Sequence, residues 1–150
     1  MKIRGFEEVP INYRKNKEEP IMPVRGTSKS AGYDFATPVD IEIKPHSKAL
    51  IWTDICSYME DDEVLMLHIR SSVGIKQGLM LANITGVIDS DYYQNKDNYG
   101  NIGICIFNPT DTIKTFKRGD RIAQGIFSKY LVADSGNTNG DRLGGIGSTN

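Results

Sequence analysis

The chain has few of the residues that usually carry metal or redox chemistry. Its 150 residues include two cysteines, two histidines and one tryptophan. His46 and His68 each stand alone, without a second His or Cys at ligand spacing, which argues against a protein-bound zinc site. Cys56 and Cys105 sit singly in apolar runs, so we expect both to be reduced and buried, as in an intracellular protein. Trp52 lies in a strand-like run and is expected in the core or at a subunit interface.

Long apolar runs and a strong net charge are also missing. No stretch approaches the roughly 20 apolar residues of a membrane span, and the N-terminal residues do not resemble a signal peptide. A net charge of −1 gives no general attraction to nucleic acid or to an anionic membrane. We therefore expect a cytoplasmic protein with no nucleic-acid partner and no membrane partner. Its length predicts one domain.

Sustained helical periodicity is missing as well, and a short helix is expected at most within residues 71–78. Residues 2–9 predict a strand, and the polar residues 10–30 predict an exposed connection. From Ala31 onward, short β-type runs recur between Pro, Gly, Asn and Asp, which predicts an all-β sandwich or barrel. Residues 133–150 contain almost no core-forming side chains. By themselves they are as typical of a disordered tail as of a glycine-rich arm.

Residues 70–93, RSSVGIKQGLMLANITGVIDSDYY, carry polar chemistry at both ends. At the first end, Arg70 precedes two serines and a glycine, a combination suited to phosphate oxygens. At the other end Asp89 and Asp91 alternate across a turn, so we expect their side chains to point in different directions. Tyr92 adds a flat apolar face with a polar tip. The second end therefore suits a base or a sugar beside a general base.

Five segments resemble, in order, the five signature motifs of the trimeric dUTP pyrophosphatases, or dUTPases. They are AGYDFATP (31–38), RSSVG (70–74), ITGVIDSDYY (84–93), RGDRIAQGIF (118–127) and DRLGGIGSTN (141–150). One short motif is weak evidence, but five in order are strong. The resemblance implies a single dUTPase-like domain over 1–150, with a distorted jelly-roll β-barrel over 1–132 and a mobile glycine-rich arm over 133–150. It also implies hydrolysis of dUTP to dUMP and pyrophosphate, which limits uracil incorporation into DNA.

The resemblance implies roles at the nucleoside end of the substrate. Asp89 matches the general base that activates water for attack on the α-phosphorus. Asn83 matches the amide that reads the uracil edge, and Tyr92 matches the ring that packs under the deoxyribose and excludes a 2′-hydroxyl. Without the resemblance, Asp89 is more typical of a turn, Asn83 of a bulge or an edge position in a strand, and Tyr92 of core packing. Further hairpin contacts are implied for Gly86, Val87 and Ile88.

The resemblance also implies roles at the triphosphate. Ser71 matches the hydroxyl that reaches the oxygen bridging the α- and β-phosphates, and Arg70 neutralises phosphate or holds the framework of the site. Gln124 matches an amide that contacts phosphate and the attacking water. Asp34 matches a carboxylate near Mg²⁺ or its waters, with the ion held mainly by phosphates. Asp120 and Arg121 are expected to form a structural ion pair. Other implied substrate contacts are Ser72, Gly74, Arg142, Ile146, Gly147, Ser148 and Thr149.

Two departures from the family pattern stand out. Ile146 takes the place of the usual stacking aromatic, which predicts weaker closure over the base by roughly 0.5–1.5 kcal/mol. The Gly that follows the third motif appears at Gly100, after an insertion at 93–99. We expect this polar insertion to be a longer hairpin loop that changes little, or else a contact for a partner protein or an adjacent subunit.

The resemblance implies a homotrimer with shared active sites. The second and fourth motifs come from one subunit, the third from a neighbour and the arm from the third subunit. Two other functions are considered. A dCTP deaminase on the same fold uses a Glu base, but residues 79–93 contain no Glu. A nucleotide-sensing module, with a regulatory protein partner if the gene is phage-encoded, is the second.

Overall fold

The computed structural model describes residues 1–135, 140 and 142–147. Its strands are β1 (Gly5–Glu8), β2 (Val24–Arg25), β3 (Tyr33–Ala36), β4 (Ile41–Ile43), β5 (Ser47–Trp52), β6 (Ile55–Tyr58), β7 (Glu63–Ile69), β8 (Met80–Leu81), β9 (Gly86–Asp89), β10 (Gly103–Asn108), β11 (Lys114–Phe116) and β12 (Arg121–Lys129). One short helix of π type, η2 (Ser72–Lys76), falls where a helix was expected. Two 3₁₀ turns complete the set, η1 (Ile11–Tyr13) and η3 (Ser90–Tyr92).

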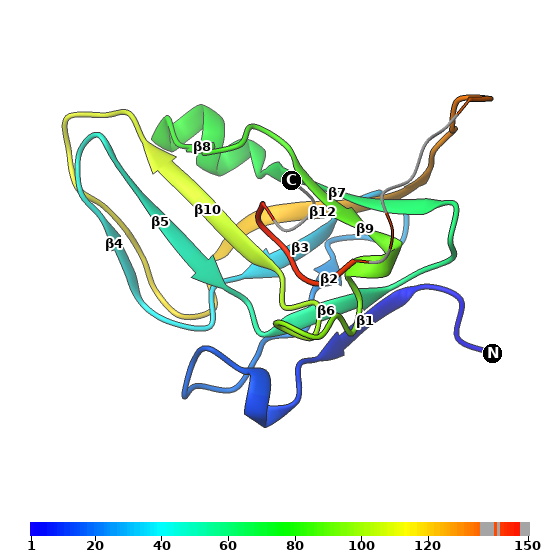
Figure 1. Cartoon of the computed structure of the whole chain (residues 1–150). Coiled ribbons are helices and arrows are strands. Elements are labelled where there is room, and N and C mark those ends of the chain that lie inside the picture. Colours follow the sequence, from blue (N-terminus) through cyan, green and yellow to red (C-terminus); the bar gives the residue numbers. More distant parts are fainter. Residues whose placement is uncertain (136–139, 141, 148–150) are drawn as a thin grey trace.

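The strands pair antiparallel in four sheets (Figure 1). The largest has the order β2-β3-β12-β7-β9, and a second has the order β5-β10-β8. Two-stranded ladders join β1 to β6 and β4 to β11. The prediction of an all-β, jelly-roll-like fold is confirmed. The fold consists of separate ladders around one core. β12 lies between β3 and β7 in the largest sheet, and the C-terminal segment leaves the sheet after it (Figure 1).

The core follows the two-residue period of the strands. Along β10, buried and half-buried residues alternate, so that Ile104 and Ile106 point into the core. They belong to a cluster that includes Phe35, Leu65 and Ile122, each at most 1% exposed. Full burial of side chains of this size contributes about 1.5–3 kcal/mol each. This cluster holds β7 and β10 in place, and these strands carry the walls of the site described below.

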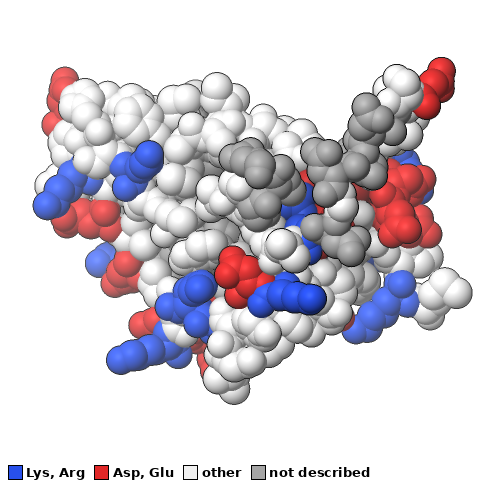
Figure 2. Space-filling model, viewed as in Figure 1, with Lys and Arg blue, Asp and Glu red and all other residues white. Residues whose placement is uncertain are grey.

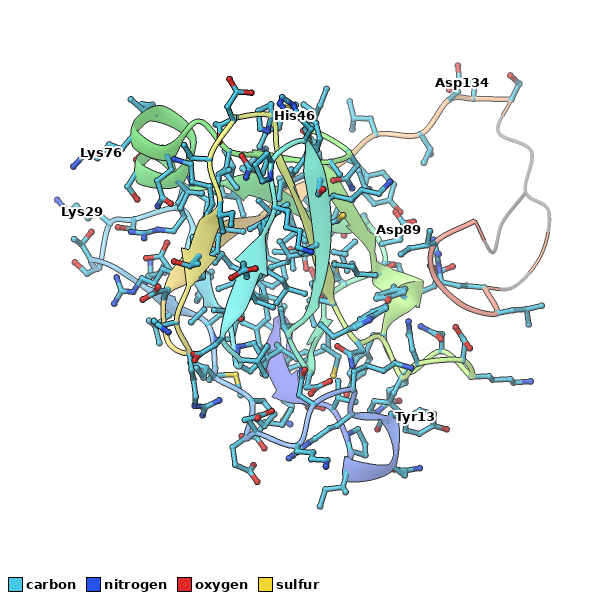
Figure 3. All side chains as sticks on the ribbon, turned by 90° about the vertical axis from the view of Figure 1, so that its left-hand side faces the viewer. Tyr13, Lys29, His46, Lys76, Asp89 and Asp134 are labelled. Carbon is cyan, nitrogen blue, oxygen red and sulfur yellow. The ribbon has the colours of Figure 1, made fainter. Side chains whose placement is uncertain are left out.

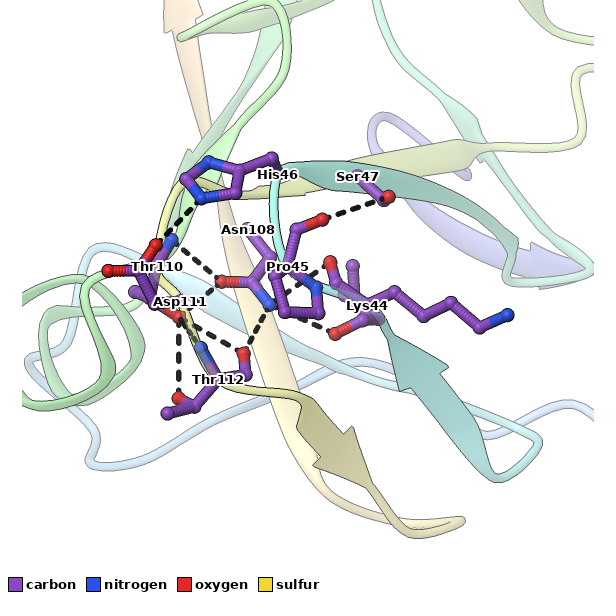
Figure 4. A network of polar contacts seen from close by, with 9 residues as sticks. Lys44, Pro45, His46, Ser47, Asn108, Thr110, Asp111 and Thr112 are labelled. Carbon is purple, nitrogen blue, oxygen red and sulfur yellow. Dashed lines mark hydrogen bonds and ion pairs between the residues drawn. The ribbon is translucent and has the colours of Figure 1, made fainter.

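A buried amide ties two turns together at one end of the fold (Figure 4). The Asn108 side-chain amide is fully buried and donates hydrogen bonds to the carbonyls of Ile43 (2.9 Å) and Thr112 (2.8 Å). Its oxygen accepts hydrogen bonds from the backbone N–H and hydroxyl of Thr110. On the surface above, His46 Nε2 lies 2.8 Å from Asp111 Oδ1. The β4–β5 and β10–β11 turns are thereby held in register.

The face shown in Figure 2 carries basic and acidic side chains near one another. The connection 10–30 is largely exposed, as predicted, although Pro20 and Pro23 are buried. Within the part of the chain that the structure describes, no helix has the length and apolar character of a membrane span.

Candidate active site

A pocket of about 310 Å³ lies between the β9 hairpin, the β5–β10 ladder and the C-terminal segment. Its volume falls within the range of small-molecule sites. Figure 3 shows Asp89 at the end of β9, where the C-terminal segment returns to the body of the fold. The predicted site residues that line the pocket are Asn83, Gly86, Val87, Ile88, Asp89, Tyr92, Arg142, Ile146 and Gly147.

The hairpin leading into β9 has a strained tip beside the pocket. Ile84 adopts φ 66°, a left-handed conformation that is unfavourable for a β-branched residue. The turn is held by the Ile84 N–H bonding to Leu81 O (3.0 Å) and the Thr85 N–H bonding to Asn83 O (2.7 Å). At the base of the hairpin, a Cβ on Gly86 would lie 2.9 Å from Leu67 Cβ, so only glycine fits against β7. The hairpin therefore presents its backbone and the exposed Asn83 to the pocket.

Asp89 and Asp91 converge on one guanidinium, so the expectation that they point in different directions was wrong. Arg142 Nη2 pairs with Asp89 Oδ2, and Arg142 Nε donates to Asp91 Oδ1 at 2.7 Å. The strand ends at Asp89, and Ser90–Tyr92 forms a 3₁₀ turn, where two-residue alternation does not apply. The Arg142 guanidinium also lies 5.9 Å from the centre of the Tyr92 ring. The C-terminal segment of this chain thus docks on its own hairpin, whereas the sequence implied an arm from another subunit.

Tyr92 is 8% exposed and lines the pocket with its ring. Its hydroxyl donates to the Asn101 carbonyl (2.5 Å) and accepts from Asn98 Nδ2 (2.8 Å). Burial raises the pKa of this phenol, so it stays protonated well above neutral pH. Asn98 lies in the insertion at 93–99, which forms a loop in which Asn95 and Asn98 are buried while Gln94, Lys96 and Asp97 are exposed. Gly100 sits at φ 84°, and a Cβ there would lie 2.8 Å from Tyr92 O, which explains the glycine after the insertion.

The residues that form the opposite wall of the pocket were not predicted from the sequence. It consists of Leu50 and Trp52 on β5 and of Gly103 and Cys105 on β10. In the ladder, Gly103 pairs with Trp52 and Cys105 pairs with Leu50. Both cysteines are unpaired, as predicted, and Cys56 is buried, but Cys105 is only half-buried. The two-residue spacing of Leu50 and Trp52, and of Gly103 and Cys105, predicts that each pair lies on one face of its strand. The sequence did not show that these two strands pair with each other.

The residues of the second and fourth motifs that are predicted to bind the triphosphate do not line this pocket; they are Arg70, Ser71, Ser72, Gly74 and Gln124. Asp34 pairs with Arg70 Nε (3.1 Å) and with Arg121 Nη1 (3.3 Å). The predicted Asp120–Arg121 ion pair is therefore wrong, since Asp120 Oδ2 instead accepts the Lys117 N–H at 2.8 Å. Ser71 and Ser72 line a separate hollow of about 210 Å³ at helix η2, and Gly74 lies within that helix.

Gln124 and Asp89 lie on the same sheet but far apart. Gln124 pairs with His68 on β7, whereas Asp89 pairs with Val64, four residues away along that strand. The separation is about 13 Å along β7 and about 10 Å across it. A water molecule hydrogen-bonds over about 3 Å. Within one chain, the two side chains do not reach the same water.

Nothing in the described residues forms a protein cage for a metal ion, since no group of three or more His, Cys, Asp and Glu side chains converges there. Both Asp34 oxygens are engaged by guanidinium groups. Asp34 therefore does not fit a direct metal ligand in this arrangement. The predicted contacts of Ser148 and Thr149 lie outside the described residues.

The fold and pocket define a class of all-β proteins that bind a small ligand between a β-hairpin and a glycine-rich C-terminal segment. A family model described as dUTPase matches residues 18–148. A deoxyuridine 5′-triphosphate nucleotidohydrolase of Lactococcus lactis is 44% identical over 153 residues, covering 99% of each chain. The chain belongs to the dUTPase family.

Solved structures agree with this assignment. The crystal structure of dUTPase from Streptococcus mutans has a TM-score of 0.78 and 39% identity, covering 87% of this chain and 99% of that one. A mutant dUTPase from phage phi11 of S. aureus has a TM-score of 0.72 and 22% identity, covering 93% of this chain and 98% of that one. That phage structure describes the coordination of a structural Mg(II) ion. At this identity, it shows the shared fold alone.

Proposed function

We propose that this protein hydrolyses dUTP to dUMP and pyrophosphate. The observation that carries the proposal is the pocket itself, in which a hairpin backbone, a carboxylate at the rim and a buried tyrosine face one small cavity. The Lactococcus lactis relative, named for dUTP hydrolysis, supports the same substrate. Because Asp89 and Tyr92 lie at opposite ends of a single turn, η3, a nucleotide seated on Tyr92 would place its α-phosphate near Asp89.

Selection of dUTP follows from the shape and polarity of the hairpin. Backbone groups between Asn83 and Ile88 would hydrogen-bond the uracil edge. Cytosine would leave buried groups unpaired, which costs on the order of 1–3 kcal/mol per group. The methyl group of thymine would be rejected by a close fit of the base against the hairpin. Tyr92 would lie under the deoxyribose and exclude the 2′-hydroxyl of UTP.

In the proposed reaction, Asp89 accepts a proton from a water molecule as the water oxygen bonds to the α-phosphorus. The bond between the α-phosphorus and the bridging oxygen breaks, and pyrophosphate leaves with the electron pair. Ser71 and Arg70 would stabilise the charge on the leaving group, and Gln124 would help to orient the water. Arg142 pairs with Oδ2 of Asp89 in this structure. An ion pair lowers the basicity of a carboxylate. The triphosphate offers Arg142 an alternative anionic partner.

We propose a homotrimer with shared sites, as the family resemblance implies, and the separation of Asp89 and Gln124 along β7 supports the sharing of sites. A second copy of the chain would bring its Arg70, Ser71 and Gln124 to the rim of this pocket. Residues 133–150 would form the arm that closes over the nucleotide, with Ser148 and Thr149 as phosphate contacts. On this view the isolated monomer is inactive, because neither half of the site is sufficient alone.

Mg²⁺ is proposed to arrive as the Mg–dUTP complex, held by phosphate oxygens, since the described residues offer no cage for it. A role for Asp34 near the waters of the ion remains a prediction. In this structure, the carboxylate of Asp34 orients Arg70 and Arg121.

A product assay tests the proposal. Purified protein is incubated with dUTP, dCTP, dTTP or UTP, with Mg²⁺ or with chelator, and pyrophosphate and ammonia are measured separately. The expected result is Mg²⁺-stimulated release of pyrophosphate from dUTP alone. Ammonia from dCTP would indicate a deaminase, and dUTP binding without turnover would indicate a nucleotide sensor. Light scattering coupled to gel filtration checks for the trimer.

A further inference from the structure

The insertion at 93–99 builds a buried polar cluster beneath the pocket. We define the asparagine cluster as Asn95, Asn98 and Asn101, which are 6%, 5% and 0% exposed. Three buried amides spaced three residues apart are unusual, because burying an amide is favourable only when its hydrogen bonds are satisfied. The sequence signal, NKDN followed by YGN, is polar and by itself predicts a solvated loop.

The amides of the cluster are bonded to one another and to Tyr92. Asn95 Nδ2 donates to Tyr92 O and to Asn98 Oδ1, both at 2.8 Å. Asn98 Oδ1 also accepts the Gly100 N–H at 3.0 Å, while Asn98 Nδ2 donates to the Tyr92 hydroxyl at 2.8 Å. The side chain of Asn98 therefore forms hydrogen bonds both with the turn of the insertion and with the hydroxyl of Tyr92.

The cluster is anchored to the body of the fold through a buried carboxylate. Asn101 Nδ2 donates to Asp54 Oδ1 at 2.7 Å, and the Asp54 N–H donates to Asn101 Oδ1 at 3.0 Å. Asp54 is fully buried and also accepts the backbone N–H groups of Lys15 (2.8 Å) and Asn16 (3.0 Å). The Tyr92 hydroxyl completes the hydrogen-bond network by donating to Asn101 O. The tip of the ring is thus tied to a rigid point outside the hairpin.

The other side of the Tyr92 ring carries the C-terminal segment. A Cβ on Gly145 would lie 2.9 Å from Tyr92 Cε1, so the segment touches the ring there. A Cβ on Gly144 would likewise lie 3.1 Å from Asp97 Cβ of the insertion. The ring therefore lies between the C-terminal segment and the asparagine cluster, and its hydroxyl is held by two hydrogen bonds, one to Asn101 O and one from Asn98 Nδ2.

We propose that Asn98 is a positioning residue that holds the Tyr92 ring at the height which distinguishes deoxyribose from ribose. The inference rests on the proposed function, because the role of Tyr92 beneath the sugar belongs to it. A ring that is free to tilt would make room for a 2′-hydroxyl. The insertion thereby sets sugar specificity without contacting the nucleotide.

The test measures kcat/KM for dUTP and for UTP in wild type, Asn98→Ala, Tyr92→Phe and the double variant. We expect Asn98→Ala to lower the ratio of kcat/KM for dUTP to kcat/KM for UTP about tenfold, because a buried polar contact is lost. Tyr92→Phe removes the same hydrogen bond together with the one to Asn101 O, and it serves if Asn98→Ala does not fold. If Asn98 acts through the Tyr92 hydroxyl, the double variant will lower the ratio no further than Tyr92→Phe alone. Lys96→Ala, an exposed change in the same insertion, is the control and should leave the ratio unchanged.

The outcomes separate the inference from the proposed function. A folded Asn98→Ala variant with an unchanged ratio, or single-variant effects that multiply in the double variant, would overturn the positioning role while dUTP hydrolysis stands. If the wild type binds dUTP without turnover, the same ratio is taken from dissociation constants through the fluorescence of Trp52, the only tryptophan, which lines the pocket. A wild type that neither hydrolyses nor binds dUTP overturns both.

Discussion

Asp89 and Asp91 offer a matched pair for testing the general base. Both are surface carboxylates with side chains 50% and 61% exposed, and both bind the same arginine, Arg142. Asp89→Asn keeps the shape of the side chain and removes its ability to accept a proton. We expect turnover of dUTP to fall at least about a hundredfold, which is about 2.7 kcal/mol in activation free energy.

The same change should barely affect stability. Exposed ion pairs contribute roughly 0–1 kcal/mol, and 1 kcal/mol shifts the Tm of a chain of this length by about 2–4 °C. Pyrophosphate release gives kcat, thermal denaturation gives Tm, and Trp52 fluorescence gives the affinity for dUTP. We expect a large loss of kcat with Tm and affinity nearly unchanged.

Asp91→Asn is the control, because it removes the other half of the Arg142 contact and leaves Asp89 intact. Its turnover should stay within about threefold of wild type, far from the effect of losing a general base. Near-normal turnover in Asp89→Asn would remove Asp89 from the role of base. Equal losses in both variants would mean that the two carboxylates act only by holding Arg142.

Three further predictions concern the pocket and the core. Ile146→Phe should tighten dUTP binding about two- to tenfold by adding a stacking ring, and an unchanged dissociation constant would contradict this. Asp54→Ala leaves donors from two distant segments unpaired and should cost more than about 3 kcal/mol in urea denaturation, whereas exposed Asp111→Ala should cost less than about 0.5 kcal/mol. Burial raises the pKa of the Cys56 thiol from its ordinary 9.0 to about 12. Above pH 9 the unfolded thiol ionises first, so the free energy of unfolding should fall between pH 9 and pH 12, and this fall should be smaller in Cys56→Ala. Equal slopes in the two proteins would refute the cysteine contribution.

The half of the candidate site that is contiguous in sequence was predictable. Asn83, Asp89 and Tyr92 belong to one hairpin and its turn, so their proximity requires only local structure. The C-terminal residues Arg142 and Ile146 were identified by motif resemblance, and both line the same pocket. The all-β fold was predictable too, because short β-type runs separated by Gly, Pro, Asn and Asp leave few alternatives.

The errors share a physical cause. Alternation of Asp89 and Asp91 was inferred from a strand, but the chain leaves the strand at Asp89 and enters a 3₁₀ turn. The ion pair of Asp120 with Arg121 was inferred from adjacency, whereas Asp34, paired through the β3–β12 ladder, binds that arginine instead. A local change of backbone geometry decided the first contact, and a residue on the neighbouring strand decided the second.

By itself, the sequence determined the strand pattern, the dUTPase motifs and the residues of the hairpin, because these depend on local residue order and chemistry. Only the tertiary structure decided which strands face the hairpin, and so placed Trp52 and Cys105 in the pocket. It also buried Asn98 of the polar insertion, since this side chain donates a hydrogen bond to Tyr92, which packs in the core. Burial of a polar side chain depends on partners that folding brings from elsewhere in the chain, and no local pattern specifies them.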